Sequence, residues 1–365
     1  MTSVEAALDA LGPSDAMWAQ PPMLLQAGQV IELAGERIRE RLLMVSSPQG
    51  TEICLRPDMT LPVAIQYAAE SARGIKAYRY DGTVFRAPGY GGSAEMESRV
   101  IGIERFGEPD VGRVDAEVLA TALAAAGAAG VSDVVVKLTD LTVFGAVLRA
   151  FDLGEPWASR FLAAAIRPSL LKSLVTTQVE PLPPDDPAWD LVDLPTHEAR
   201  RYALALVRTG QGAPLAGRSA ESIAERLVAK AAFARSPTPP EPVRETLAAL
   251  LKISGSPEKV LRARSRLFIQ MGLRMDEYLD VATRRVDALR ELSGDVPVFV
   301  DPKYEGNFWY YDGFLFQVRS ATGQKRVVAA GGRYDGLLFK LTSGELDAPA
   351  AGCSLFPRAL FEAMR

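Results

Sequence analysis

The decapeptide AAGGRYDGLL, at residues 329–338, sets two glycines before an arginine, a tyrosine and an aspartate. An aromatic segment, GNFWYYDGFLFQV, precedes it at residues 306–318. Within that segment Phe314, Phe316 and Val318 recur at every second position, which is typical of a strand with one buried face. The glycines of the decapeptide permit two backbones to approach closely. We therefore expect antiparallel strands here, with polar side chains gathered near their ends.

Strand and helix patterns alternate through the first third of the chain. A strand is predicted at residues 52–55, and it leads into a helix. Residues 75–107 read as a strand, a glycine-rich loop and a second strand. An alanine-rich helix follows and ends at Gly130. For residues 30–47 the sequence predicts a strand or turn followed by a charged, amphipathic segment.

Residues 143–290 differ in character, because strand patterns disappear and helical periodicity dominates. Strands return in VPVFVDP, at residues 296–302. The sequence therefore predicts an α+β fold with an antiparallel sheet flanked by helices. We expect residues 1–142 and 291–365 to form one sheet-containing domain, and residues 143–290 to form a mainly helical insertion.

Composition places the chain among globular proteins, with 48% hydrophobic and 24% charged residues in a length of 365. Its net charge of −4 argues against a nucleic-acid binder, which normally presents a basic face to phosphates. Cys54 and Cys353 lie far apart among apolar residues, so we expect buried thiols and no disulfide. No apolar run is long enough to span a membrane, and the acidic N-terminus is unlike a secretory signal. These features predict a cytoplasmic protein.

The chain contains a single histidine, His197, in the segment DLPTHEARR. A Ser–His–Asp triad or a multi-histidine metal site would have to use this residue. We expect it on the surface at the start of a helix, without a catalytic role. The sequence predicts no metal site and no cofactor.

Five motifs follow one another along the chain: LRPDMT at 55–60, VFR at 84–86, GIERFG at 102–107, YYDG at 310–313 and GGRYDGL at 331–337. Their order and spacing resemble those of class II aminoacyl-tRNA synthetases, and of histidyl-tRNA synthetase in particular. Each motif alone is a weak signal. The five in this order indicate the class II synthetase fold.

A shorter relative, the regulatory subunit of ATP phosphoribosyltransferase, is more similar still, notably in QVIELAGERIRERL and EICLRPDMTLPVA. This resemblance implies a non-catalytic regulatory subunit in histidine biosynthesis, whose partner is a short-form catalytic phosphoribosyltransferase. It implies that L-histidine acts as an allosteric feedback inhibitor through this subunit. It also implies a homodimer formed around residues 18–45, as in other class II folds.

Departures from the synthetase pattern favour the regulatory subunit over the enzyme. In the synthetase a C-terminal arginine holds the ATP γ-phosphate, whereas here Ala359 takes its place and Arg358 lies one residue away. One position on a helix rotates a side chain by about 100°, so the contact should be lost. The arginine that precedes the tyrosine pair in the synthetase is missing from EGNFWYYDG. We also expect no anticodon-binding domain, since the sequence ends at Arg365.

The resemblance further implies a histidine-binding pocket. Glu104 matches the glutamate that binds the imidazole, and Tyr310 or Tyr311 matches the tyrosine opposite. Asp58 stands where a glutamate receives the α-amino group, with Thr60 beside it. This set is chemically reasonable, because carboxylates pair with an ammonium and orient an imidazole N–H.

The carboxylate of such a ligand needs a cation, and the sequence offers Arg86 or Arg99. Where the synthetase has a glutamine that contacts the ligand, this chain has Val100 beside Arg99. Tyr310 and Tyr311, as neighbours in a strand, would point to opposite faces, so only one of them should line the pocket.

Structural roles remain open for several of these residues. Arg56 and Asp58 could form an ion pair at a helix start. Arg333 and Asp335 could pair locally, so that GGRYDGL is structural. Glu104, in an apolar strand, needs a partner wherever it lies. The loop APGYGGS, at residues 87–93, matches no phosphate-loop spacing and is expected to be an ordinary loop.

Two other functions are compatible with the motifs. A truncated synthetase would still activate histidine with ATP, which an ATP–pyrophosphate exchange assay would detect, but Ala359 argues against it. A synthetase paralogue could instead sense tRNA-like RNA, but the net charge of −4 argues against that.

Overall fold

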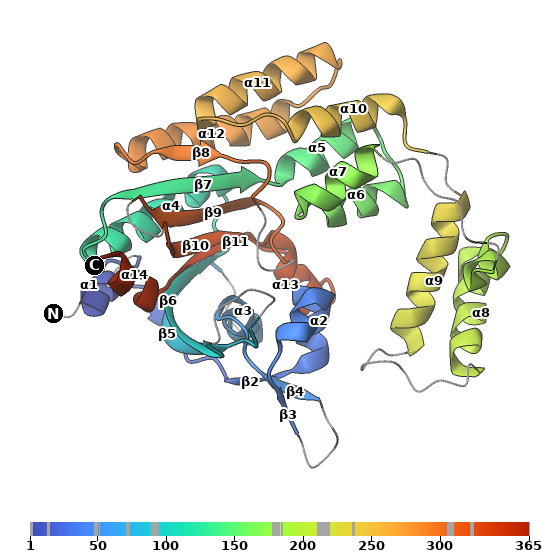
Figure 1. Ribbon diagram of the computed structural model, residues 1–365, viewed down its shortest axis with the longest axis horizontal. Coiled ribbons are helices and arrows are strands. Elements are labelled where there is room, and N and C mark those ends of the chain that lie inside the picture. The colour runs from blue at the N-terminus through green and yellow to red at the C-terminus, as the bar shows by residue number, and fades with distance from the viewer. Residues whose placement is uncertain are drawn as a thin grey trace.

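The computed structural model describes residues 3–12, 15–46, 50, 52–70, 74–88, 95–176, 183, 185–209, 220–235, 238–304, 310–321 and 325–364. Figure 1 shows a twisted, strongly curved sheet with helices on both faces and a pair of helices set apart from it. The predicted loop APGYGGS lies mostly outside the described residues. In the described ranges, no helix is both long enough and apolar enough to cross a lipid bilayer.

The main sheet has eight strands in the order β1-β5-β6-β11-β10-β9-β7-β8. Neighbouring strands are antiparallel except at the two edges, where β1 pairs with β5 and β8 with β7 in parallel. The strands are β1 (Met17–Trp18), β5 (Lys76–Phe85), β6 (Glu97–Phe106), β7 (Val134–Asp140), β8 (Val298–Val300), β9 (Phe314–Ser320), β10 (Val327–Arg333) and β11 (Ala350–Leu355). A small second sheet joins β2 (Leu24–Gln26), β4 (Ile53–Leu55) and β3 (Met44–Val45). The predicted α+β class, a largely antiparallel sheet flanked by helices, is confirmed.

Different helices cover the two faces of the main sheet. On one face lie α4 (Val111–Ala128) and α12 (Asp276–Leu292), which pack together. Small alanine side chains let α4 lie close to the strands, where they join a core that includes Phe314, Phe316 and Val318. The other face holds α3 (Thr60–Ala69) inside the curve of the sheet (Figure 1), with α2 (Ala27–Ala34) and α13 (Asp335–Leu341) nearby.

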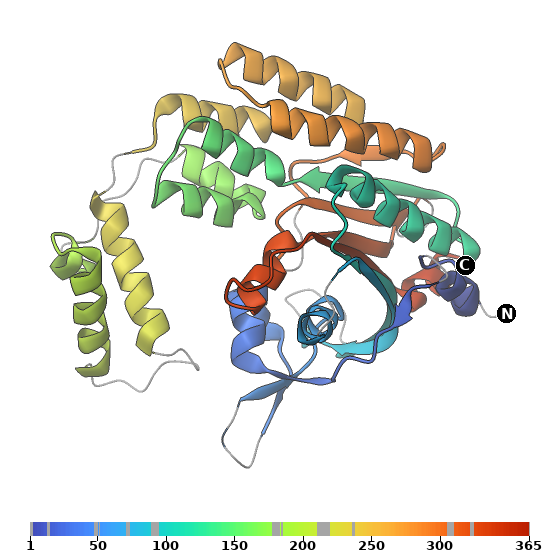
Figure 2. The ribbon, with the colours of Figure 1, turned by 180° about the vertical axis from the view of Figure 1, so that it is seen from behind.

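The remaining helices lie mostly between β7 and β8 in the sequence. They are α5 (Thr142–Ala150), α6 (Trp157–Ala165), α7 (Pro168–Thr176), α8 (Thr196–Thr209), α9 (Ala220–Arg235), α10 (Glu241–Leu250) and α11 (Pro257–Gln270), with α1 (Ser3–Asp9) and α14 (Pro357–Ala363) near the termini. Figure 2 shows from behind that α8 and α9 stand away from the sheet. They pack on the short 3₁₀ helix η2 (Pro187–Leu191) around a small core of their own. The division of the chain into a sheet domain and a helical insertion stays a prediction.

The segment at residues 30–47 was predicted wrongly as a strand or turn at its start. Residues Ala27–Ala34 form α2, and Glu36–Arg41 form a 3₁₀ helix, η1. Val30, Ile31, Leu33 and Ala34 are all buried, and this spacing suits one face of a helix. Packing of that face outweighs the weak strand preference of two β-branched residues. Gly35, at a φ of 89°, ends the helix in a conformation that glycine adopts easily.

Buried ion pairs tie α4, α11 and α12 to the sheet. Asp115 of α4 accepts hydrogen bonds from Nε of Arg285 on α12 and from Nε of Arg333 on β10, each at 2.7 Å. Asp140, at the end of β7, lies 3.1 Å from Arg285 and 3.4 Å from Arg264 of α11. All five side chains are buried. Each carboxylate meets two guanidinium groups, which compensate part of the cost of removing these charges from water.

Candidate functional site

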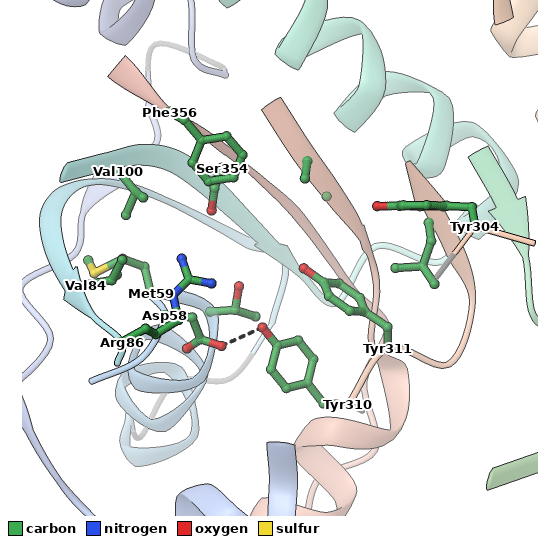
Figure 3. A pocket seen from close by; sticks show the side chains of 14 residues that line it. Asp58, Met59, Val84, Arg86, Val100, Tyr304, Tyr310, Tyr311, Ser354 and Phe356 are labelled. Carbon is green, nitrogen blue, oxygen red and sulfur yellow. Dashed lines mark hydrogen bonds between the residues drawn. The ribbon is translucent and has the colours of Figure 1, made fainter. Parts of the chain in front are cut away.

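A pocket of about 50 Å³ opens on the α3 side of the main sheet (Figure 3). The start of α3, strands β5 and β6 and the segment before β9 bring its walls together. Five of the predicted site residues line it, together with the apolar Val100: Asp58, Thr60, Arg86, Tyr310 and Tyr311. Residues of four motifs, LRPDMT, VFR, YYDG and GGRYDGL, therefore converge on one pocket.

Asp58 provides the pocket's carboxylate at the start of α3. The backbone N–H of Leu61 donates to its Oδ1 at 3.2 Å, and the hydroxyl of Tyr310 donates to its Oδ2 at 2.6 Å (Figure 3). Burial raises the pKa of Asp58, while these hydrogen bonds and the Arg86 charge act against that rise. Arg86 lines the same pocket, and burial together with Arg41 lowers the pKa of its guanidinium, although the charge of Asp58 acts against that fall. The pocket thus presents an acidic and a basic group side by side.

The alternative pairing of Asp58 with Arg56 is wrong. Arg56 donates from Nε to the carbonyl of Thr83 at 2.8 Å and from Nη1 to the carbonyl of Pro21 at 2.9 Å. Arg56 is therefore a structural residue that fixes neighbouring backbone, whereas Asp58 both stabilises the first turn of α3 and faces the pocket.

Glu104 lies beside the pocket within a group of hydroxyls. Thr60 donates to its Oε1 at 2.7 Å, Tyr80 donates to the same oxygen at 3.3 Å, and Tyr334 donates to Oε2. Among the described residues, no ion pair includes Glu104. Burial raises its pKa to about 8, although the hydrogen bonds oppose that rise. Glu104 is thus a buried carboxyl group that gains a proton near neutral pH.

The carboxyl group of Glu104 fits there only because β11 has no side chain opposite it. A Cβ on Gly352 would overlap the Glu104 carboxyl group. Glu104 is absent from the residues that line the pocket, and Thr60 stands between the two. Glu104 is therefore a neighbour of the pocket that is connected to its wall by the hydroxyl group of Thr60.

Tyr310 and Tyr311 both line the pocket, so the expectation that only one of them would do so is wrong. They precede β9, which begins at Phe314, and the alternation of a strand does not apply to them. Their ring centroids are 4.8 Å apart. Burial raises the pKa of both hydroxyls well above the ordinary value, so both remain neutral.

Tyr80 and Tyr334 are two further buried tyrosines beside Glu104, and neither was identified from the sequence. The Tyr334 ring lies 5.9 Å from that of Tyr310 and 6.2 Å from that of Tyr311. Tyr80 also forms a 2.7 Å hydrogen bond with Ser354 of β11. The need of a buried Glu104 for partners was the signal that pointed to such residues, but it gave no position for them.

Arg99 does not line the pocket. It forms two hydrogen bonds with Asp81, at 2.8 and 2.6 Å, and its side chain is 53% exposed. Neighbouring residues of a strand point to opposite faces, and Val100 faces the pocket. Of the two arginines that the sequence offered, the structure therefore brings only Arg86 to the site.

The C-terminal motif also departs from a phosphate-binding arrangement. Arg358 forms ion pairs with Glu362, at 2.9 Å, and with Glu95. Phe356, two residues earlier, lines the pocket instead. Arg333 and Asp335 pair at 2.8 Å, as expected for a structural role of GGRYDGL. His197 is exposed at the start of α8, and both cysteines are free and buried. Within the described ranges, no cluster of His, Cys, Asp and Glu residues is suited to hold a metal ion.

Comparison with known proteins extends these findings. A family model described as histidyl-tRNA synthetase matches residues 19–185 and 206–360. A protein of Agrobacterium fabrum named ATP phosphoribosyltransferase regulatory subunit is 31% identical over 354 residues, which cover 92% of this chain and 89% of that protein. A protein of the same name from a Chelativorans species is 28% identical over 359 residues, covering 96% and 94%.

The solved structures agree on the fold. A structure titled as an ATP phosphoribosyltransferase regulatory subunit/histidyl-tRNA synthetase from Bacillus halodurans superposes with a TM-score of 0.63 at 18% identity, covering 100% of this chain and 78% of that one. This likeness confirms the class II synthetase-like architecture predicted from the motifs. The chain therefore belongs to the histidyl-tRNA synthetase family and, within it, to the regulatory subunits of ATP phosphoribosyltransferase.

Proposed function

We propose that this chain assembles with a short-form catalytic subunit of ATP phosphoribosyltransferase and binds L-histidine as its feedback inhibitor. The names of the relatives support a partnership with a catalytic subunit. The observation that carries the histidine site is that Asp58 and Arg86 line the same tyrosine-walled pocket. An α-amino acid presents an ammonium and a carboxylate, and these two groups complement that pair.

The binding mode follows from the chemistry of the walls. Asp58 would receive the ammonium group, and Arg86 would bind the carboxylate with its planar guanidinium. The ammonium would also keep Asp58 ionised, because a nearby positive charge lowers the pKa of a carboxyl group. The imidazole, largely neutral near pH 7, would lie against the hydroxyls and rings of Tyr310 and Tyr311. Glu104 would orient this wall through Thr60 and Tyr334.

Entry of the ligand would require some movement. A cavity of about 50 Å³ has room for only a few water molecules. Tyr310 and Tyr311 lie outside the regular strands, so we expect their side chains to shift when histidine enters. Such a shift gives a physical route to inhibition, since a ligand changes a complex only by binding two of its states unequally.

We also propose that two copies of the chain pair through the surface around residues 18–45. Large apolar side chains are exposed there on β1, β2 and the nearby loop, including Trp18 at 52%, Met23 at 54% and Leu24 at 50%. Exposed apolar surface of this kind is typical of a protein–protein contact. Replacement of Trp18 by glutamate should then shift the mass measured by light scattering from dimer to monomer. An unchanged mass would argue against this interface.

The decisive experiment measures phosphoribosyl transfer by a purified short-form catalytic subunit, with and without this chain, across a histidine titration. We expect activity to rise when the chain is added and to fall with histidine. Asp58→Asn should raise the histidine concentration needed for inhibition, whereas Asp81→Asn, on the exposed face, should leave it unchanged. If the chain altered neither activity nor histidine sensitivity, the proposal would be wrong. The complex would act in the cytoplasm, which cell fractionation tests.

A further inference from the structure

A second hollow, of about 380 Å³, lies on the α4 and α12 side of the sheet. It opens where α5, the start of α12 and the end of β10 meet, near the first residue of α4. Its charged lining includes Arg149, Arg274, Arg285, Arg333 and Asp335. Its volume falls within the range of small-molecule sites in proteins, roughly 300–1,000 Å³. None of these residues lines the amino-acid pocket, so this cleft is a separate feature.

The floor of the cleft is fixed and electrically balanced. Arg333 and Arg285 are only 2% and 5% exposed. Arg333 is held by Asp115 at 2.7 Å and by Asp335 at 2.8 Å, and Arg285 is held by Asp115 at 2.7 Å. Because these guanidinium groups are already paired, the floor supplies a rigid polar surface and little free charge.

The rim carries two arginines whose charge is not balanced in this way. Arg149 lies in the last turn of α5, and Arg274 precedes α12. Both are exposed, and within the part of the chain that the structure describes neither forms an ion pair. The acidic residues of the rim, Asp276 and Glu277, stand in the first turn of α12. There the positive end of the helix dipole offsets part of their charge.

We propose that this cleft binds a small molecule through an oxyanion group, either a phosphate or a carboxylate, which Arg149 and Arg274 recognise. A guanidinium group presents parallel N–H donors that match two oxygens of such a group. The polar floor would accept the remainder of the molecule. The inference goes beyond the proposed function, because it concerns a different cavity and needs neither histidine nor a catalytic partner.

Isothermal titration calorimetry of the full chain tests the site, with inorganic pyrophosphate as the phosphate probe and citrate as the carboxylate probe. We expect at least one probe to bind, and the double variant Arg149→Gln/Arg274→Gln to bind it about tenfold or more weakly, since both charged hydrogen-bond donors are lost. Which probe binds better tells a phosphate site from a carboxylate site.

The matched control is Arg262→Gln/Arg266→Gln, which removes the same charge from the exposed face of α11. It should bind the probe as the unmodified chain does, and both double variants should melt at the same temperature as that chain. The proposal is overturned if neither probe binds up to about 10 mM, or if the two double variants weaken binding equally, because the effect would then come from net charge alone.

Discussion

Two carboxyl groups are buried in opposite ways on the two faces of one sheet. Glu104 meets three hydroxyl groups, and burial raises its pKa to about 8. Burial also acts to raise the pKa of Asp140, but Arg285 and Arg264 outweigh it and hold that pKa below the usual range. The first group can change its protonation near neutral pH, whereas the second stays ionised. Glu104 thus lies in an environment where its charge can change, whereas Asp140 belongs to an ion network whose charges stay fixed.

The two environments meet at the end of β10. Arg333 donates to Asp115 in the ion network, and the next residue, Tyr334, donates to Glu104 on the other face. Neighbouring residues thus hold the two carboxyl environments on either side of the sheet. Because Arg333 is fixed in the buried ion network, the position of the next residue, Tyr334, is constrained as well.

Breaking the ion network should have the largest effect. Arg285→Ala leaves Asp115 and Asp140 each without one of its cations. Removing one partner of a buried pair typically lowers the free energy of unfolding by about 3–5 kcal/mol, and we expect a loss of that size in denaturant unfolding. The neighbouring Arg284 forms exposed pairs with Asp280 and Asp110, so Arg284→Ala should cost no more than about 1 kcal/mol. Similar losses of unfolding free energy in Arg285→Ala and Arg284→Ala would contradict this distinction between buried and exposed ion pairs.

The raised pKa of Glu104 should make the free energy of unfolding depend on pH. The pKa of Glu104 rises from 4.5 to about 8 in the folded chain, so the folded state keeps a proton that the unfolded state loses. This contribution to stability is complete below pH 4.5 and disappears as pH rises through 8. Between pH 5 and pH 8 we expect the free energy of unfolding of the unmodified chain to fall by roughly 2–4 kcal/mol more than that of Glu104→Gln.

Denaturant unfolding at several pH values measures this difference. Glu108→Gln is the matched control, because Glu108 is a half-buried glutamate paired with Arg105, and it should keep the pH dependence of the unmodified chain. If unfolding free energies of the unmodified chain and Glu104→Gln stayed parallel across this range, Glu104 would not hold its extra proton.

The two regions also differ in how far the sequence could predict them. The pocket was found because its residues belong to short local motifs, and Asp58, Thr60 and Glu104 do lie together. The choice between Arg86 and Arg99 could have been made as well. Glu104 and Val100 are four residues apart in one strand and share a face, so Arg99 must lie on the other.

The ion network left no comparable signal. Asp115 and Arg285 are 170 positions apart, and an aspartate or an arginine on an amphipathic helix is usually a surface residue. The prediction that only one of Tyr310 and Tyr311 lines the pocket was wrong for a different reason. The strand pattern was extended back from Phe314, although the strand begins there. In both cases tertiary packing decided the outcome.

A third prediction tests whether the negative charge of Asp58 contributes to histidine binding in the pocket. Asp58→Asn keeps oxygens and a similar shape at the start of α3 but loses the negative charge, and a hydrogen bond to a charged group contributes about 1.5–3 kcal/mol. We expect the dissociation constant for L-histidine, measured by calorimetry, to rise roughly 10- to 100-fold. Asp81→Asn removes a carboxylate from the outer face and should leave it unchanged. Equal effects would mean that Asp58 does not meet the ammonium group.

The smallest expected effect distinguishes Arg86 from Arg99, the two arginines that the sequence offered for the ligand carboxylate. Arg86→Lys keeps the positive charge in the pocket but loses the planar pair of donors that suits a carboxylate. We expect histidine affinity to fall about three- to tenfold, or roughly 1 kcal/mol. Arg99→Lys changes only an exposed pair with Asp81, so affinity should stay the same and stability should change by less than about 1 kcal/mol. If Arg99→Lys weakened histidine binding and Arg86→Lys did not, the ligand carboxylate would lie at the outer face, and the pocket beside Glu104 would not be the histidine site.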